Sequence, residues 1–317
     1  MTGNATQDRF LGAILGMAIG DAFGMPVAGW SATTIADWYD TVTDYLPRKF
    51  PDGDEVGPGE ITDDTEIALC IIESVTAGQG QIDVENIGIR MSYLTRSDSR
   101  RWMTDETATA LQDRSEQHQF QLPLVDDECV HPDVLARGIP IGLMHSMGAP
   151  DEAAIRSDVS AITRITHGSP LAMSAVEAVA RAVAMAARHE LALDQLRAEV
   201  ANQLPDGAVR EALGRHGADL SESNEVVETL LSALRVVETA TAFEDVLERA
   251  VAPGGATDTR AALAAAIYGA HHGSGVIPQR LIDGLESRIF VSLAAPWFYR
   301  TIARLRGRAI DFRPGIG

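Results

Sequence analysis

The sequence predicts an all-α protein, built as a single bundle of close-packed helices. Three observations predict this fold class. Alanine is abundant, β-branched residues rarely alternate with polar ones, and apolar residues recur at helical spacing in most segments. With 317 residues the chain can bury a sizeable core, and neither a repeat period nor a low-complexity linker divides it. We therefore expect one domain over residues 1–317.

A first helix is predicted over residues 9–20. Gly12, Gly16 and Gly20 recur every four residues and leave one face of this helix bare. Another helix must therefore pack very close to it, and in a soluble protein this spacing is not a membrane dimer motif. We expect the helix to end at Gly20-Asp21.

The middle of the chain begins with an irregular region. Residues 30–60 are rich in proline and glycine and predict a long loop, and no strand is predicted anywhere in the chain. The apolar spacing then favours helices over 65–77, two over 83–112, 134–147 with an interruption at Pro140, 151–164 and 170–189.

The C-terminal part is also predicted to be helical. Residues 191–250 indicate three or four amphipathic helices, and an alanine-rich helix over 259–272 has so little side-chain bulk that it must be central. His271 and His272 end that helix, where the helix dipole favours positive charge. Pro278 begins a further helix, and the basic tail from Arg304 is expected at the periphery.

The charge of the chain narrows the classes of partner. A formal net charge of −19 without a basic stripe argues against nucleic acid. The N-terminus lacks a basic region, and the apolar run over 10–19 is too short to span a bilayer. Cys70 and Cys129 have no metal-like spacing. We expect a cytoplasmic protein with no membrane partner, and the sequence leaves the oligomeric state open.

A turn ahead of the helix at 65–77 concentrates oxygen-bearing side chains. It reads Thr62-Asp63-Asp64-Thr65, with Glu66 next. Asp63 and Glu66 have the spacing of a helix capping box, so the turn could be only a good helix start. Adjacent carboxylates repel each other unless they share a cation or a proton, and all-oxygen ligation suits Mg²⁺ or Mn²⁺.

A second turn of the same build lies far downstream, at Gly254-Gly255-Ala256-Thr257-Asp258-Thr259. It too has glycines, then Thr and Asp, then a helix. Our central hypothesis is that the two turns meet in space and hold a divalent metal.

Three segments together resemble the ADP-ribosylglycohydrolase family, which includes the ADP-ribosylarginine hydrolases and the dinitrogenase reductase-activating glycohydrolases. The segments are 12–26 with its Gly20-Asp21-Ala22-Phe23-Gly24 run, the acidic turn after Pro58-Gly59, and the second turn with its alanine-rich helix. Weaker matches are Arg137 ahead of Ile139-Pro140 and Thr166-His167 ahead of Pro170. The resemblance covers nearly the whole chain and implies an orthogonal bundle of helices.

The resemblance also implies a site with two divalent ions, Mg²⁺ or Mn²⁺. Thr62, Asp63, Asp64 and Asp258 would hold one ion, and Asp258 and Thr259 would contribute to the other. Asp63 or Asp64 would take the proton of the attacking water. The predicted substrate-binding residues are Asp21, Gly24, Arg137, His167, Gly254 and Gly255.

Three of these residues have a structural interpretation beside the functional one. Asp21 could be a polar residue at a helix end, and His167 a structural histidine between two helices. Arg137 could meet a phosphate or pair with a carboxylate of this acidic chain.

The chain departs from the family at three places. The family usually has carboxylates where this chain has Ala28 and Ala256, and in the family both serve the second ion. A glycine-asparagine-glycine loop that helps to cradle a diphosphate is replaced by about His131-Pro132-Asp133. Proline removes a backbone donor, and aspartate repels phosphate. We therefore expect one ion rather than two, with two not excluded.

These observations predict a metal-dependent hydrolase that cleaves an N-glycosidic (ADP-)ribosyl bond. Its substrate could be an ADP-ribosylated protein or a small nucleoside or nucleotide metabolite. The alternative is a catalytically impaired member of the family that binds ADP-ribose or a related nucleotide, and a helical scaffold without a ligand is a third hypothesis.

Overall fold

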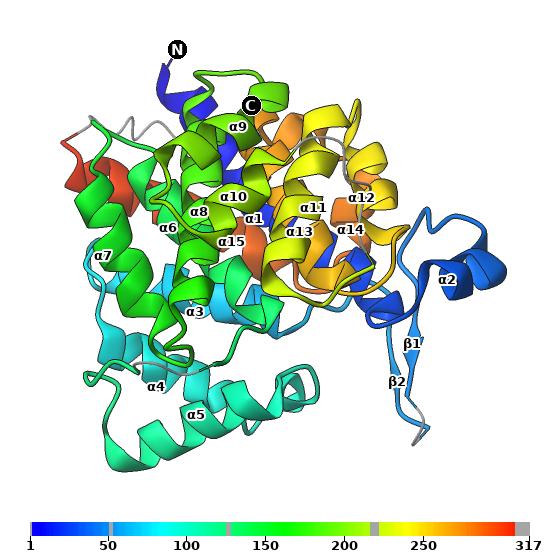
Figure 1. The fold of residues 1–317 in the computed structure, drawn as a ribbon, viewed down its shortest axis with the longest axis horizontal. Coiled ribbons are helices and arrows are strands. Elements are labelled where there is room, and N and C mark those ends of the chain that lie inside the picture. The colour runs from blue at the N-terminus through cyan, green and yellow to red at the C-terminus, as the bar shows by residue number, and fades with distance from the viewer. Residues whose placement is uncertain (1, 51–52, 125–127, 216–221, 308–317) are drawn as a thin grey trace.

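The computed structural model describes residues 2–50, 53–124, 128–215 and 222–307, and most of them are helical. Two helices from opposite ends of the chain lie at the centre of the bundle (Figure 1): α1 (Thr2–Gly24) and α13 (Thr257–His272). They run antiparallel, because residues early in α1 face residues late in α13. The predicted all-helical bundle is confirmed.

Glycines allow the backbones of these two helices to touch. A Cβ atom at Gly16 would lie 2.3 Å from the carbonyl oxygen of Ala265, and one at Gly20 would lie 2.2 Å from that of Ala261. Gly12 and Gly24 continue the same face, so α1 extends to Gly24 instead of ending at Gly20. The close partner predicted for this helix is therefore α13, whose alanine-rich sequence makes it central, as expected.

The segment over 30–60 is more regular than the predicted loop. It contains α2 (Ala32–Tyr39), which begins at Ser31, where the side chain accepts from the backbone N–H of Thr34 at 3.1 Å. It also contains a hairpin of β1 (Arg48–Lys49) and β2 (Glu55–Val56), so the prediction of no strand was wrong. Two residues per strand are too few to leave an alternating pattern in the sequence. The hairpin projects from the bundle beside α2 (Figure 1).

The predicted helices of the middle segment are found close to their expected bounds. They are α3 (Asp63–Ala77), α4 (Val84–Leu94), η2 (Asp98–Arg101), α5 (Asp105–Gln117), η3 (Pro132–Arg137), α6 (Gly138–His145), α7 (Glu152–Thr163) and α8 (Pro170–Arg188). Pro140 lies in the first turn of α6, where the missing N–H costs no hydrogen bond within the helix. The predicted interruption is therefore a late start of the α-helix.

The C-terminal part supplies the remaining helices. They are α9 (Leu193–Gln203), α10 (Ala208–Gly214), α11 (Val226–Thr239), α12 (Phe243–Val251), α14 (Gln279–Gly284) and α15 (Arg288–Leu305), with the short turns η1 (Met25–Val27) and η4 (Ser274–Val276). In the described part of 191–250 four of these helices are found, within the expected three or four. Most of the tail from Arg304 lies outside the described residues.

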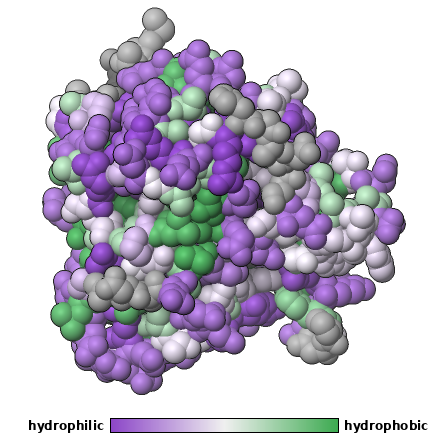
Figure 2. All heavy atoms as spheres, in the orientation of Figure 1, coloured by the Kyte–Doolittle hydropathy of each residue, from purple (hydrophilic) through white to green (hydrophobic). Residues whose placement is uncertain are grey.

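Two helices are long and apolar enough to cross a membrane by length and composition alone, Ala5–Val27 and Pro170–Arg188. Of their most apolar windows, 94% and 78% are buried inside the protein, as in core helices of a globular domain. The face drawn in Figure 2 is mostly hydrophilic, with an apolar area near its middle. These helices are therefore weak evidence for a membrane.

Three histidines gather where α13 ends against α8. The ring of His271 lies 4.2 Å from that of His189 and 4.7 Å from that of His272, measured between centroids. Burial, and then the charges of His189 and His272, lower the pKa of His271 to about 4. The helix dipole, which would favour the charged form, is therefore outweighed by burial and by the neighbouring histidines.

We predict that Gly16→Ala lowers the free energy of unfolding by about 1–3 kcal/mol, because the added methyl group must push against a backbone carbonyl of α13. Gly214→Ala in α10 is the matched control, since nothing lies within 4 Å of its Cβ position and alanine favours a helix. Urea denaturation measures both. Equal stability of the two variants would contradict the close contact.

We predict that His271 makes stability fall on acidification. Its pKa is about 4 in the folded state and about 6.5 when unfolded. Between these values the unfolded chain binds the extra proton, so this contribution is complete above pH ~6.5 and is lost as the pH falls towards ~4. His271→Phe keeps the ring packing without the titration and should flatten the dependence of unfolding free energy on pH in that window. An unchanged slope would show that His271 has no such role.

Candidate functional site

The acidic turn at the start of α3 forms a buried cluster of oxygen atoms. Thr62 is the cap of this helix, and its hydroxyl accepts from the backbone N–H of Asp64 at 3.3 Å. The cap is therefore Thr62, and Asp63 is not needed for it. The side chains of Asp63 and Asp64 are nonetheless buried in the first turn, with 4% and 3% of their surface exposed.

Asp21, near the end of α1, holds this turn from the other side. Its carboxylate accepts from the backbone N–H of Thr62 at 2.9 Å, from the Thr62 hydroxyl at 2.8 Å and from the Thr65 hydroxyl at 2.6 Å. Burial raises the pKa of Asp21 to about 7 against the effect of these hydrogen bonds, and the charge of Asp258 adds to the rise. Asp21 is a positioning residue in this geometry, rather than only a polar helix end.

The two turns meet, as the sequence predicted. Asp64 Oδ2 accepts from the hydroxyl of Thr259 at 2.7 Å, which joins the start of α3 to the start of α13. Asp64 Oδ1 and Asp63 Oδ2 are buried and lack a hydrogen-bond partner. Burial raises the pKa of both carboxyls well above the ordinary value, and the charges of neighbouring aspartates raise it further.

Backbone contacts fix the start of α13. Gly255 donates to the Trp30 carbonyl at 2.9 Å and accepts from Gly29 at 2.9 Å, so the glycine pair lies against the loop that follows α1. Gly254 has a φ of +74°, and a Cβ there would lie 2.3 Å from the oxygen of Trp30. Gly24 likewise faces the backbone of Thr257. Close backbone packing accounts for all three glycines, and their predicted substrate contacts stay untested.

Arg137 and His167 lie together behind the acidic turn. Arg137 is fully buried and donates to the Thr166 hydroxyl at 2.6 Å, while its Nε and Nη2 have no hydrogen-bond partner. Burial lowers the pKa of Arg137, against the charges of Asp133 and Asp63. His167 Nδ1 lies 2.7 Å from the Thr166 hydroxyl, and its Nε2 lies 3.4 Å from Asp133 Oδ1. A buried guanidinium is thus available beside the carboxylates.

Asp133 is the centre of a polar network that the sequence did not indicate. It accepts from the hydroxyl of Thr107 at 2.9 Å and lies 3.5 Å from Nδ1 of His131. Burial alone would raise the pKa of Asp133, yet its interactions with His131 and His167 lower it well below the ordinary value. Histidines far apart in sequence carried no signal that they would share one carboxylate.

Arg48 of the β1–β2 hairpin is a second residue that sequence analysis missed. Its Nη1 donates to the carbonyl of Met25 at 2.6 Å, and its guanidinium lies 5.3 Å from the ring of Phe50 and 5.7 Å from that of Trp102. Burial raises the pKa of Asp258, and the positive charge of Arg48 opposes that rise. Arg48 therefore brings a cation towards Asp258 from the hairpin, and it is anchored on Met25, three residues ahead of Ala28.

The residues at the two turns can be tested against a divalent ion. Among the described residues, no three His, Cys, Asp or Glu side chains form a ready-made metal cluster. The buried oxygens of Asp63 and Asp64 without partners are, however, the hard donors that Mg²⁺ or Mn²⁺ prefers. Ala28 and Ala256 offer no such atoms. The donor set thus fits one ion better than two.

A cavity of about 890 Å³ opens beside this cluster, of a size common for small-molecule sites. His131 and Thr166 line it, and Asp105, Glu106, Glu128 and Glu225 also belong to its wall. In the part of the chain that the structure describes, no Lys or Arg lines this cavity. None of the five predicted metal ligands lines it either. The cavity meets the site through His131, which lies beside Asp133, and through Thr166, which accepts from Arg137.

We predict that Asp21→Ala destabilises the protein by about 1–3 kcal/mol, because three donors at the start of α3 lose their buried acceptor. Asp21→Asn should cost less, since its amide oxygen still accepts from the Thr62 N–H and the Thr62 hydroxyl can turn to accept from the amide. Urea unfolding of the two variants provides the comparison. Equal stability of Asp21→Ala and the wild type would contradict the positioning role.

Comparison with known proteins agrees with this fold. Residues 2–309 match the family model described as ADP-ribosylglycohydrolase. An uncharacterized protein of Archaeoglobus fulgidus is 31% identical over 94% of this chain and 98% of its own length. The ADP-ribosyl-[dinitrogen reductase] glycohydrolase of Rhodospirillum rubrum is 29% identical over 91% of this chain and 94% of its own.

A solved structure titled ADP-ribosylglycohydrolase-related protein complex superposes with a TM-score of 0.79 at 27% identity, covering 94% of this chain and 99% of that one. The family match spans both turns, both central helices and the cavity wall. On this evidence the chain belongs to the ADP-ribosylglycohydrolase family, whose members are glycosidases acting on ADP-ribosyl bonds.

Proposed function

We propose that this protein is a divalent-metal-dependent glycosidase that hydrolyses the N-glycosidic bond of a small ribosyl compound of the nucleoside type. The proposal keeps the reaction of the family and changes the preferred substrate. The observation that carries it is the acidic wall of the cavity beside the carboxylates of α3 and α13.

The charge of the cavity supports a substrate without a diphosphate. Four carboxylates contribute to the wall, and the described lining residues include no Lys or Arg. One of the four, Asp105, is paired with Arg100 at 2.5 Å, which leaves three without such a partner in the wall. The interactions that lower the pKa of Asp133 also favour its ionised form, at the point where a relative's backbone would approach a diphosphate. Like charges that face each other across a site disfavour binding. A neutral nucleoside, or one with a cationic leaving group, avoids this repulsion.

The carboxylates of both turns support a metal-dependent reaction. Asp63, Asp64 and Asp258 would hold a Mg²⁺ or Mn²⁺ ion with help from the hydroxyls of Thr62 and Thr259. When bound, the ion would supply positive charge for ribose hydroxyls and for the attacking water. It would also offset the free-energy cost of burying these carboxylates without a partner. In its absence, burial raises the pKa of Asp63 and Asp64.

The two adjacent aspartates have different partners, which suggests different roles. Asp64 is tied to Thr259 through one oxygen and is suited to joining the two turns. Asp63 interacts electrostatically with Asp133 and Arg137. These two residues contact His131 and Thr166 of the cavity wall. We assign Asp63 as the base that takes the proton of the attacking water, and Arg137 as the buried cation that stabilises the ionised form of Asp63.

Turnover tests the substrate class directly. The wild-type protein with Mn²⁺ is incubated with nucleosides that differ in their base and, separately, with ADP-ribosylarginine, and released ribose or ADP-ribose is measured. We expect faster hydrolysis of a nucleoside. Faster hydrolysis of ADP-ribosylarginine would overturn the shift of substrate and keep the glycosidase. Binding of ADP-ribose without turnover of any substrate would favour the impaired family member instead.

We predict that the metal-stripped protein binds about one Mn²⁺ ion per chain in a calorimetric titration, and that Asp258→Ala abolishes the binding. The reason is that Asp258 is the only predicted carboxylate ligand on α13. Asp206→Ala is the control, because its side chain is 96% exposed and paired only with Arg210 at the surface. Unchanged Mn²⁺ affinity of the Asp258 variant would contradict this ligand set.

A further inference from the structure

The structure assigns a second catalytic group to the proposed reaction: His131 is the acid that protonates the leaving group, and Asp133 holds its ring. This inference rests on the proposed function, because an acid is needed only where a glycosidic bond to a poor leaving group is broken. It depends on the position of His131, on its partner and on the two forms that its ring can adopt.

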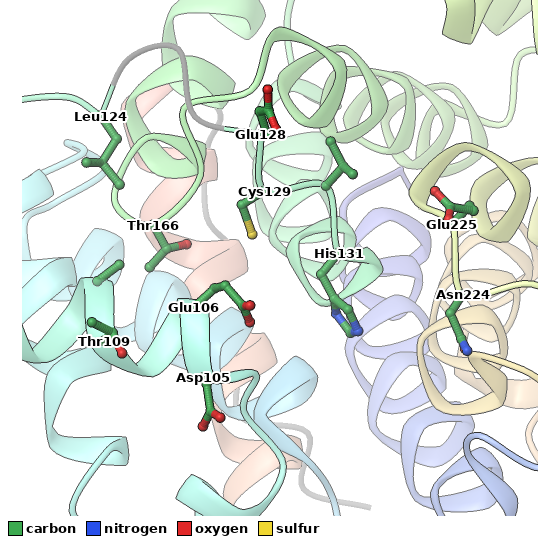
Figure 3. A pocket seen from close by; sticks show the side chains of 12 residues that line it. Asp105, Glu106, Thr109, Leu124, Glu128, Cys129, His131, Thr166, Asn224 and Glu225 are labelled. Atoms are coloured by element: carbon green, nitrogen blue, oxygen red, sulfur yellow. The ribbon is translucent and has the colours of Figure 1, made fainter.

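The position of His131 suits a group that meets the substrate. Its side chain is 48% exposed and lines the cavity, whereas Asp133 behind it is only 7% exposed. Figure 3 shows the imidazole ring pointing into the space between Glu106 and Asn224.

The partner of His131 is built into the bundle. Asp133 is held by the Thr107 hydroxyl of α5 at 2.9 Å and lies 3.4 Å from Nε2 of the buried His167. These contacts fix the carboxylate before a substrate arrives. A carboxylate that orients a histidine and stabilises its protonated ring is the usual arrangement for acid–base catalysis by histidine.

Nδ1 of His131 has a partner in both protonation states. In the protonated ring, Nδ1–H faces the Asp133 carboxylate at 3.5 Å, and Nε2 carries the proton that goes to the leaving group. After this transfer Nδ1 keeps its proton towards the carboxylate and Nε2 is bare. In the other neutral tautomer Nδ1 accepts from the backbone N–H of Asp133 at 3.4 Å, as the cap of η3. The ring can therefore give up and regain a proton without losing its place.

The charges around the ring favour the protonated form. Asp133 on the same turn lies 3.5 Å from Nδ1, and Glu106 on α5 and Glu225 ahead of α11 line the same cavity. The charge of Asp258 on α13 also acts on the ring, but a bound ion would offset it. Burial would lower the pKa of His131, but the hydrogen bond and the charge of Asp133 outweigh it, and the pKa is raised. These charges therefore favour the form of His131 that can act as an acid.

The step balances with these groups. The C1′–N bond breaks and its electron pair stays on the leaving nitrogen, which takes the proton from His131. Water forms the new C1′–O bond and loses its proton to Asp63. His131 then regains a proton from solvent and Asp63 releases one, so the net reaction consumes one water.

We predict that His131→Asn slows hydrolysis of a nucleoside by about 10²–10⁴-fold and changes hydrolysis of 4-nitrophenyl riboside by less than about 3-fold. Nitrophenolate departs without a proton, so it needs no acid. Asparagine is also a good helix cap and keeps the acceptor for the Asp133 N–H, so η3 should still form. The fall of kcat/KM for the nucleoside at high pH should disappear in the variant.

His118→Asn is the matched control. His118 is exposed at the end of α5 with a φ of +52°, a left-handed conformation that asparagine tolerates. It should leave both rates unchanged. Equal slowing of both substrates by His131→Asn, or no slowing of either, would overturn the acid role while wild-type turnover leaves the glycosidase intact. No turnover of either substrate by the wild type would overturn both.

Discussion

The contact between the backbones of α1 and α13 is the constraint on which the rest of the structure depends. Four glycines of α1 face α13 at positions where a Cβ would lie within 2.2–2.4 Å of a carbonyl oxygen. Such a contact leaves no freedom to slide, because neither helix has side chains that could adjust at the interface. The end of α1 and the start of α13 are thereby fixed against each other, and the hydroxyl of Thr257 accordingly donates to the Gly24 carbonyl at 2.7 Å.

The candidate site exploits that rigidity to gather negative charge. Asp21 comes from α1, Asp63 and Asp64 from α3, and Asp258 from α13, and burial raises the pKa of all four carboxyls. Hydroxyls of Thr62, Thr65 and Thr259 satisfy some of their oxygens. Burying the oxygens that have no partner is electrostatically unfavourable, and a cation, a proton or ordered water would offset this cost. This is the physical basis of the metal proposal.

The sequence predicted the parts of this arrangement that local patterns encode. Glycines at every fourth position predicted the close helix pair, and two turns of the same build predicted that the turns meet, which they do through Asp64 and Thr259. Arg48 was missed because its role depends on where a four-residue ladder places it, which leaves no periodic signal. Asp133 was read as a residue that repels phosphate. That reading ignored His131 and His167, because only the tertiary fold brings His167 to the same carboxylate.

All three departures from the family alter the distribution of charge around the site. Ala28 and Ala256 remove two carboxylates from the neighbourhood of Asp258, and Arg48 brings a fixed cation towards it. With these anions missing and a fixed cation near Asp258, we expect less electrostatic demand for a second ion. On the opposite side, His131 and Asp133 lie where the proposed reaction would need a proton donor. Both observations agree with the proposal that this pocket serves proton transfer to a small leaving group and holds one metal ion.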